Sequence, residues 1–233
     1  MIRFTSVINM PETRCIFCDE LADTREHIPP KQFFKGIPDK DLITVPSCKK
    51  CNQGFQSDED FFRQFWVSIL MGRAPRAKEI ALNEMTRAIL RRPALAWRMF
   101  SQMIPVNRYT ASGLFVGQST LYHITENDRT RINRIAEKII RGLFFKEFDQ
   151  TIPHDWIIGI HWITPEMEQK QNLLELAKTM KWNVIREDTF AYGVSSVPNT
   201  NQSVWLLDFF KTPLFYVLVL DKETASSNAD RPQ

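Results

Sequence analysis

The sequence predicts an α+β protein in which a small zinc-stapled N-terminal module precedes a mixed domain with a largely antiparallel sheet. Three observations support this prediction. The only four cysteines form two C-x-x-C pairs within the first 51 residues. Apolar residues recur at helical spacing through the middle of the chain. The last third alternates short apolar runs with turn residues, a pattern typical of antiparallel strands.

The composition is that of a globular protein with a substantial core. The chain has 233 residues, of which 43% are hydrophobic and 24% are charged. Its longest apolar runs, such as residues 213–220, are far shorter than a bilayer span, and no basic segment followed by an apolar core opens the chain. These features exclude disordered and collagen-like chains, and we expect a cytoplasmic protein without a membrane partner.

The cysteine pairs predict a structural Zn²⁺ site. Cys15 and Cys18 form C-I-F-C, and Cys48 and Cys51 form C-K-K-C. Each C-x-x-C turn directs two thiolates at one point, so two turns complete a tetrahedron of ligands. A pair of disulfides is the first alternative, but disulfides are rare in the cytosol. A thioredoxin-like redox pair, the second alternative, would explain only one of the two motifs.

The residues between the two cysteine pairs and directly after the second pair suggest hydrolytic chemistry. The run E-H-I-P-P places Glu26 beside His27, Asn52 directly follows the second cysteine pair, and an acidic cluster occupies residues 58–60. A single histidine is usually an ordinary packed or exposed side chain. A histidine titrates near neutral pH, however, and carboxylates bind hard divalent ions, so this combination suits phosphodiester hydrolysis.

Over about residues 13–62, the chain carries C-x-x-C, then E-H-I-P, then C-x-x-C-N and then an acidic residue. This series of motifs is similar to the zinc-stapled branch of the HNH endonuclease (His-Me finger, ββα-metal) superfamily. The resemblance implies a β-hairpin with His27 on its first strand, then a helix, with one catalytic Mg²⁺ or Mn²⁺ held between them. His27 would be the general base that activates water. Glu26 would bind the metal, and Asn52 would orient the base or help to hold the ion.

The sequence departs from the family at its third motif position. A second histidine is usual there as a metal ligand, but none follows Asn52 until His123. A carboxylate stands in for it in some zinc-bearing members, and Asp60 has about the right spacing. Glu59 and Asp58 are its rivals, and all of them offer oxygen ligands that suit Mg²⁺.

Charge is concentrated in the middle of the chain. Residues 1–65 carry 9 Lys/Arg against 10 Asp/Glu, residues 66–148 carry 14 against 6, and residues 149–233 carry 7 against 11. A local basic block is typical of a protein that binds a polyanion, and a solvated Arg-rich surface is the alternative. The candidate nucleic-acid-binding residues are Arg87, Arg91, Arg131, Arg134, Lys138 and Arg141. The last four step by 3, 4 and 3 along one helix, so they would either follow phosphates or form an ordinary solvated face.

The remaining elements follow from periodicity and capping signals. Apolar stripes predict helices over residues 58–72, 76–91, 94–103 and 165–180, and Thr125 begins the strongest helix. A hairpin is expected over residues 110–124, and strands over 156–162, 181–186, 189–194, 203–209 and 214–220. We therefore divide the chain into a nuclease module (1–62), a basic helical and α+β domain that binds substrate or a partner (63–220), and a flexible tail (221–233).

The function expected from these features is that of a metal-dependent endonuclease acting on DNA. One alternative is a catalytically inactive zinc-stapled nucleic-acid-binding protein, and another is an adaptor that recruits a nuclease complex. Association with a protein partner or with a second copy of the chain is also compatible with these features. Roles in restriction, phage defence, mobile elements and repair all fit these residues.

Overall fold

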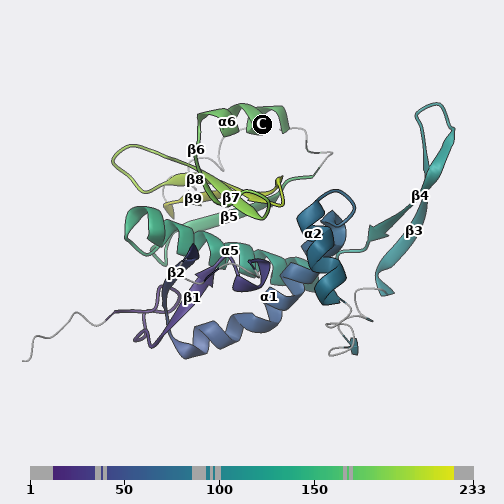
Figure 1. Cartoon of the computed structure of the whole chain (residues 1–233). Coiled ribbons are helices and arrows are strands. Elements are labelled where there is room, and N and C mark those ends of the chain that lie inside the picture. Colours follow the sequence, from purple (N-terminus) through teal and green to yellow (C-terminus); the bar gives the residue numbers. More distant parts are fainter. Residues whose placement is uncertain are drawn as a thin grey trace, which may run out of the picture.

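The computed structural model describes residues 13–34, 38, 41–85, 93–94, 97, 101–164, 167 and 170–222. Its elements, in chain order, are β1 (Thr24–Ile28), the short 3-10 helix η1 (Lys31–Phe33), β2 (Ile43–Ser47), α1 (Lys49–Leu70), α2 (Pro75–Ile80), the π-helical turn η3 (Ala81–Met85), β3 (Met103–Tyr109), β4 (Phe115–Tyr122), α5 (Glu126–Phe148), β5 (Ile157–Trp162), α6 (Lys170–Thr179), β6 (Lys181–Arg186), β7 (Phe190–Ser196), β8 (Ser203–Phe209) and β9 (Thr212–Leu220) (Figure 1). Every strand pair is antiparallel, so the expected mixed α+β architecture with an antiparallel sheet is confirmed.

The N-terminal part is a β-hairpin followed at once by a helix. β1 pairs with β2, and His27 lies opposite Thr44. The thiol of Cys48 caps α1, because its Sγ accepts a hydrogen bond from the backbone N–H of Cys51 at 3.4 Å. The helix expected over residues 58–72 therefore begins at Lys49, since the second cysteine pair itself forms the first turn.

Helix α5 is the central helix of the molecule. Its start agrees with the prediction, because Thr125 and Asp128 form a reciprocal capping box. Its apolar face, which includes Ile135 and Ile139, is fully buried. The helix packs against α1 and against both strands of the N-terminal hairpin. It therefore joins the cysteine-bearing part of the chain to the C-terminal sheet.

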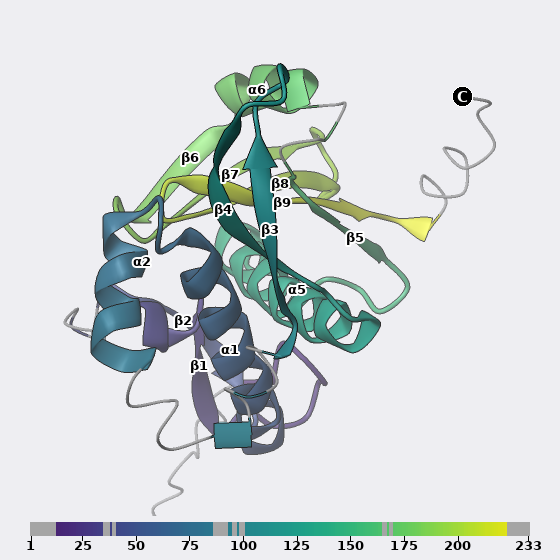
Figure 2. The same ribbon diagram turned by 90° about the vertical axis from the view of Figure 1, so that its right-hand side faces the viewer.

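The C-terminal sheet has the strand order β5-β9-β8-β7-β6. Figures 1 and 2 show α5 beneath this sheet and α6 on its other side. The four strands predicted from Lys181 onwards are confirmed within one or two residues. Helix α6 covers Lys170–Thr179 of the predicted range of 165–180, and residues 165, 166, 168 and 169 of that range lie outside the described residues.

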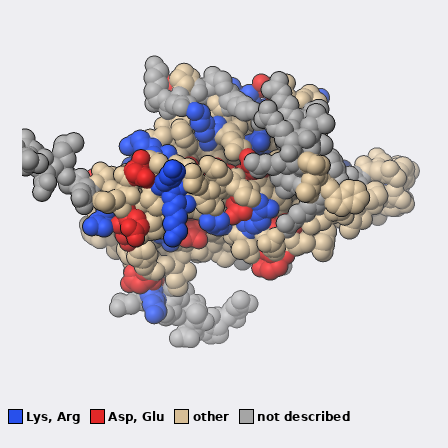
Figure 3. Space-filling view, turned by 90° about the horizontal axis from the view of Figure 1, so that it is seen from below, with Lys and Arg blue, Asp and Glu red and all other residues tan. Residues whose placement is uncertain are grey.

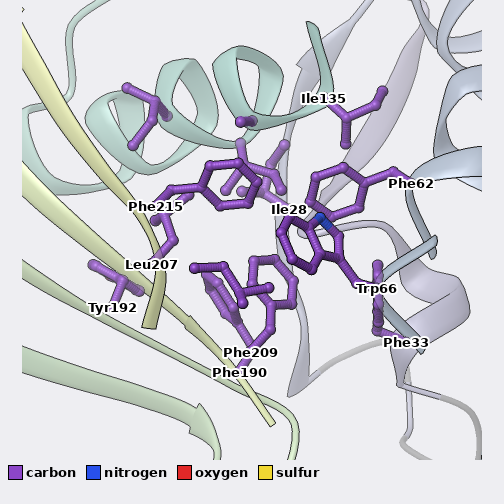
Figure 4. Packing of buried hydrophobic residues seen from close by; sticks show 14 of the residues in the cluster. Ile28, Phe33, Phe62, Trp66, Ile135, Phe190, Tyr192, Leu207, Phe209 and Phe215 are labelled. Atoms are coloured by element: carbon purple, nitrogen blue, oxygen red, sulfur yellow. The ribbon is translucent and has the colours of Figure 1, made fainter. Parts of the chain in front are cut away.

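One hydrophobic cluster runs through the described molecule, with members from Ile16 to Val219. At its centre, Phe62 of α1 stacks on Phe215 of β9, with ring centroids 5.9 Å apart, and contacts the edge of Phe209 (Figure 4). The expected division at residue 62 falls inside α1, and the cluster contains residues from both sides of it. The aromatic stripe of α1 is thus the seam between the two parts.

The middle of the chain departs most from the prediction. The hairpin expected over residues 110–124 is present, but its first strand begins at Met103, where a helix was expected to end. Figures 1 and 2 show this β3–β4 hairpin projecting from the body. The helix expected over residues 76–91 is represented by α2 and η3 as far as Met85, and residues 86–92 lie outside the described part. Residues 1–12 and 223–233, the latter in the expected tail, also lie outside it.

No helix in the described ranges is both long and apolar enough to cross a membrane.

Candidate functional site

The four cysteines form one cluster. Cys15 and Cys18 precede β1, and Cys48 and Cys51 lie at the start of α1. Their sulfur atoms all lie within 4.8 Å of one another, and none forms a disulfide. Cys18 Sγ and Cys48 Sγ are 3.6 Å apart. In a tetrahedral zinc site with Zn–S bonds of about 2.3 Å, neighbouring sulfurs would lie about 3.8 Å apart. The cluster therefore fits a structural metal ion, as the cysteine spacing predicts.

The local electrostatics of this cluster favour a bound cation. The hydrogen bond from the backbone N–H of Cys51 lowers the pKa of the Cys48 thiol. Burial raises the pKa of the Cys51 thiol, and the neighbouring sulfurs add to that effect. Four thiolates at this separation repel one another, and a divalent cation among them would remove that repulsion.

His27 lies on β1, directly opposite Thr44 on β2. Successive side chains on a strand point to opposite faces. Glu26 and Ile28 are both buried, whereas His27 is partly exposed, although its Nε2 atom is buried. His27 therefore projects from the face of β1 opposite to that of its two neighbours.

Two contacts align the chain around His27 with helix α1. Asn52 Nδ2 donates to the backbone carbonyl of Arg25 at 3.1 Å. Farther along the helix, Arg63 Nε donates to Gln32 Oε1 at 2.9 Å. His27 lies between Arg25 and Gln32 in the chain, and Asp60 lies between the two helical partners. The segment that carries His27 thus runs beside the stretch of α1 that carries Asp60.

Glu26 and Glu59 meet at a buried lysine. Both bind the fully buried ammonium group of Lys138 from α5; the Lys138 Nζ–Glu26 Oε1 distance is 2.9 Å, and Glu59 Oε1 is the second partner. Burial raises the pKa of Glu59, against the opposing effect of Lys138. The structure therefore places both carboxylates in a buried ion-pair cluster with Lys138, and their expected role as ligands of a catalytic ion stays a prediction.

The residues of the expected basic ridge of α5 are paired with acidic side chains. Arg131 Nε and Arg134 Nη1 each bind one oxygen of Asp58 at 2.7 Å, and Arg131 stacks over Phe61 of α1. Arg141 pairs with Glu137 on its own helix. Spacing of 3, 4 and 3 defines a common face, but it does not reveal which acidic side chains these residues meet. Lys138 is buried between two glutamates and is therefore not placed to contact phosphates. A phosphate-binding role for Arg131, Arg134 and Arg141 stays a prediction.

The other candidate nucleic-acid-binding residues, Arg87 and Arg91, lie outside the described residues. Figure 3 shows Lys and Arg interspersed with Asp and Glu on the face that it presents. Exposed basic side chains nonetheless occur near the hairpin and the cysteine cluster, at Arg25, Lys31, Lys49 and Lys50. Their exposure follows from the structure and not from the sequence.

Sequence reasoning also missed the role of two α5 residues, Lys138 and Gly142. A Cβ atom placed on Gly142 would overlap Ile28 Cγ1 and lie 2.6 Å from Ile28 Cδ1. A lysine next to Ile139 and a glycine next to Leu143, beside the apolar face of this helix, are the signals that the sequence offers for this contact.

Comparisons with models of protein families, with curated proteins and with solved structures returned no match. The argument for function therefore depends on the chain's own residues.

Proposed function

We propose that this protein is a metal-dependent endonuclease of the HNH type that hydrolyses phosphodiester bonds in DNA. The observation that carries the proposal is the placement of His27 on the first strand of a hairpin, beside a helix whose first turn contains half of the four-cysteine cluster. This strand–strand–helix order is the one that the sequence resemblance implies. The cysteine cluster stabilises the scaffold and leaves the imidazole for chemistry.

His27 acts as the general base that takes a proton from the attacking water. Imidazole is the side chain whose ordinary titration range lies nearest neutral pH, which suits histidine to proton transfer. Asn52 fixes the strand that carries His27 through its bond to the Arg25 carbonyl. The Asn52 Nδ2 group donates to Thr24 Oγ1 and to the Arg25 carbonyl, and Oδ1 is the acceptor atom of that side chain.

Asp60 is the carboxylate that we assign to the catalytic ion. The assignment follows the sequence resemblance, in which an acidic residue about eight positions after the asparagine takes the place of the second histidine. Asp60 and Asn52 are separated by eight residues of α1, which places their side chains about 80° apart around the helix axis. A bound Mg²⁺ or Mn²⁺ would offset negative charge on the scissile phosphate and the leaving oxygen.

A second candidate function is nucleic-acid binding without cleavage. The observation that favours it is the use of Glu26 and Glu59 in the ion-pair cluster, which removes two of the expected ligands from the side of His27. Binding alone would need the zinc-stapled scaffold and the exposed cations near the hairpin, but it would not need His27.

Incubation of the full chain with supercoiled plasmid and with single-stranded RNA, in Mg²⁺ or Mn²⁺, separates the two functions. The proposal predicts metal-dependent DNA cleavage by wild type that is lost in His27→Ala and reduced in Asp60→Asn. Asp155→Asn, a change at an exposed carboxylate in the turn before β5, is the control and should cleave normally. Binding by wild type without cleavage in either metal would favour the second function.

A further inference from the structure

We propose that helix α5 is the positioning element for His27, because it fixes the residue on each side of that histidine. The inference rests on the proposed function for the chemical role of His27, whereas the positional relation itself stands on the contacts of Lys138 and Gly142. Neither residue contacts a reacting atom in this account. Both act through the backbone of β1.

The first contact holds the residue before His27. Lys138 Nζ donates to Glu26 Oε1 at 2.9 Å, and the same oxygen accepts a hydrogen bond from the backbone N–H of His27 at 3.0 Å. The second oxygen, Oε2, is buried without a hydrogen-bond partner among the described residues. Both contacts of this carboxylate therefore pass through one atom, which links the ammonium group on α5 to the peptide group of His27.

The second contact holds the residue after His27. Ile28 is 1% exposed and lies so close to Gly142 that no larger residue fits at that position of α5 without displacement. Gly142 follows Lys138 by four residues, so both lie on the same face of the helix. One face of α5 therefore supports β1 on both sides of His27, from behind the face on which the imidazole lies.

This arrangement gives a reason for two costly features of α5. A buried lysine needs paired carboxylates to offset its desolvation, and a glycine in a helix interior weakens the helix relative to alanine. Neither feature is needed for α5 to bury its apolar face. Both are explained if the strand that carries His27 must lie close to the helix in one register.

The test uses the full zinc-bound chain labelled with ¹⁵N at its four histidines, whose His27 ring signals are assigned by their absence in His27→Ala. Gly142→Ala pushes Ile28 away and should move the His27 ring signals while those of the other three histidines remain in place. Ile28→Ala in the same chain removes the overlapping atoms and should return the His27 signals toward wild type. Gly54→Ala is the matched control, because the nearest atom to its added Cβ, Arg134 Nη2, lies at 3.7 Å.

Cleavage by the same variants gives the second readout. Gly142→Ala should lower the single-turnover rate by about 10- to 100-fold with KM unchanged, since small displacements of a catalytic group cost that much. The Gly142→Ala/Ile28→Ala double variant should recover most of it. If Gly142→Ala does not fold, Lys138→Met in zinc-bound form should give the same shift of the His27 signals.

Wild-type His27 ring signals in a folded, zinc-bound Gly142→Ala or Lys138→Met protein would overturn the positioning role. Failure of the proposed function looks different: His27→Ala would then cleave like wild type, or wild type would not cleave, while the histidine signals still respond to Gly142→Ala.

Discussion

At the scale of single residues, Cys48 has two separate roles, as a metal ligand and as a helix cap, and one substitution can distinguish them. Cys48 contributes a thiolate to the cluster and also caps α1 through its Sγ. Serine is a preferred helix N-cap, so Cys48→Ser keeps the cap and removes the ligand. We expect wild type to retain one zinc per chain and Cys48→Ser to lose it together with the fold of the hairpin, because structural zinc supplies folding free energy.

Elemental analysis and thermal unfolding of the two proteins check this prediction. Asp23 and Lys49 lie close to the cluster without contributing a thiolate, and Lys49→Ala is the control that should keep its zinc. Full zinc content in Cys48→Ser, or a stoichiometric disulfide in wild type, would contradict a four-thiolate site.

Asp208 in β8 carries a second prediction at the residue scale. Burial raises its pKa to about 6, although backbone N–H groups of Thr212 and Lys211 act in the opposite direction. The folded state thus binds this proton more tightly than the unfolded chain, whose value is about 3.9. The contribution of Asp208 to the free energy of unfolding is therefore largest below about pH 4 and is lost as the pH rises through 6.

Asp208→Asn removes this titration and keeps an oxygen for the same backbone donors. Urea unfolding of both proteins between pH 5 and 7.5 should show the variant gaining stability relative to wild type as the pH rises. If the two proteins differ by the same free energy of unfolding at pH 5 and at pH 7.5, burial does not raise the pKa of Asp208 in the folded state.

At the scale of elements, the sequence predicted those whose signals are local. The Thr125 cap, the apolar face of α5 and the strands after Lys181 depend on residues close together in the chain, and the structure has them where expected. The first turn of α1 was missed because its N-cap is a cysteine of the cluster. The first strand of the β3–β4 hairpin was missed because its partner is needed to distinguish a strand from a short helix.

The candidate site also has features that the sequence predicts and features that it does not. The four-cysteine cluster follows from motif spacing, whereas the position of His27 on a strand is what the family resemblance implies, and the structure has both features. The partners of the acidic residues could not be predicted, since Glu26 and Glu59 lie 112 and 79 residues before Lys138. Only the packing of α5 against α1 and β1 decides which carboxylates meet a lysine.

The α5 arginines give a prediction at the element scale. Arg131 lies against α1, bound to Asp58 and to the Ser57 carbonyl, and its side chain is 15% exposed. Arg131→Met should lower the free energy of unfolding by about 1–2 kcal/mol, as expected when a charge-assisted hydrogen bond is lost. In a His27→Ala background it should leave the salt dependence of DNA binding unchanged. A salt slope reduced by about 0.9 would instead assign Arg131 to a phosphate contact.

At the scale of the whole molecule, the cysteine-bearing N-terminal part and the C-terminal sheet share one core. Trp66 of α1 packs against Trp162 and Phe215 of the sheet, with centroids 5.6 and 5.4 Å away. A fragment of residues 13–70 would expose this aromatic stripe and leave Glu26 and Glu59 without Lys138. We expect the fragment to lack the cooperative thermal transition of the full chain, measured by circular dichroism with zinc present. A cooperative, zinc-bound fragment would show instead that this part folds independently.

The central claim is that His27 is the base of a metal-dependent nuclease, and chemical rescue tests it most directly. His27→Gly opens space where the imidazole stood and leaves the four cysteines intact. In Mg²⁺ or Mn²⁺, its single-turnover rate of plasmid cleavage should fall by about 10²- to 10⁴-fold, the usual contribution of a general base. Added imidazole should restore part of that rate in proportion to its neutral fraction. Cleavage by His27→Gly at the wild-type rate without imidazole would contradict the account.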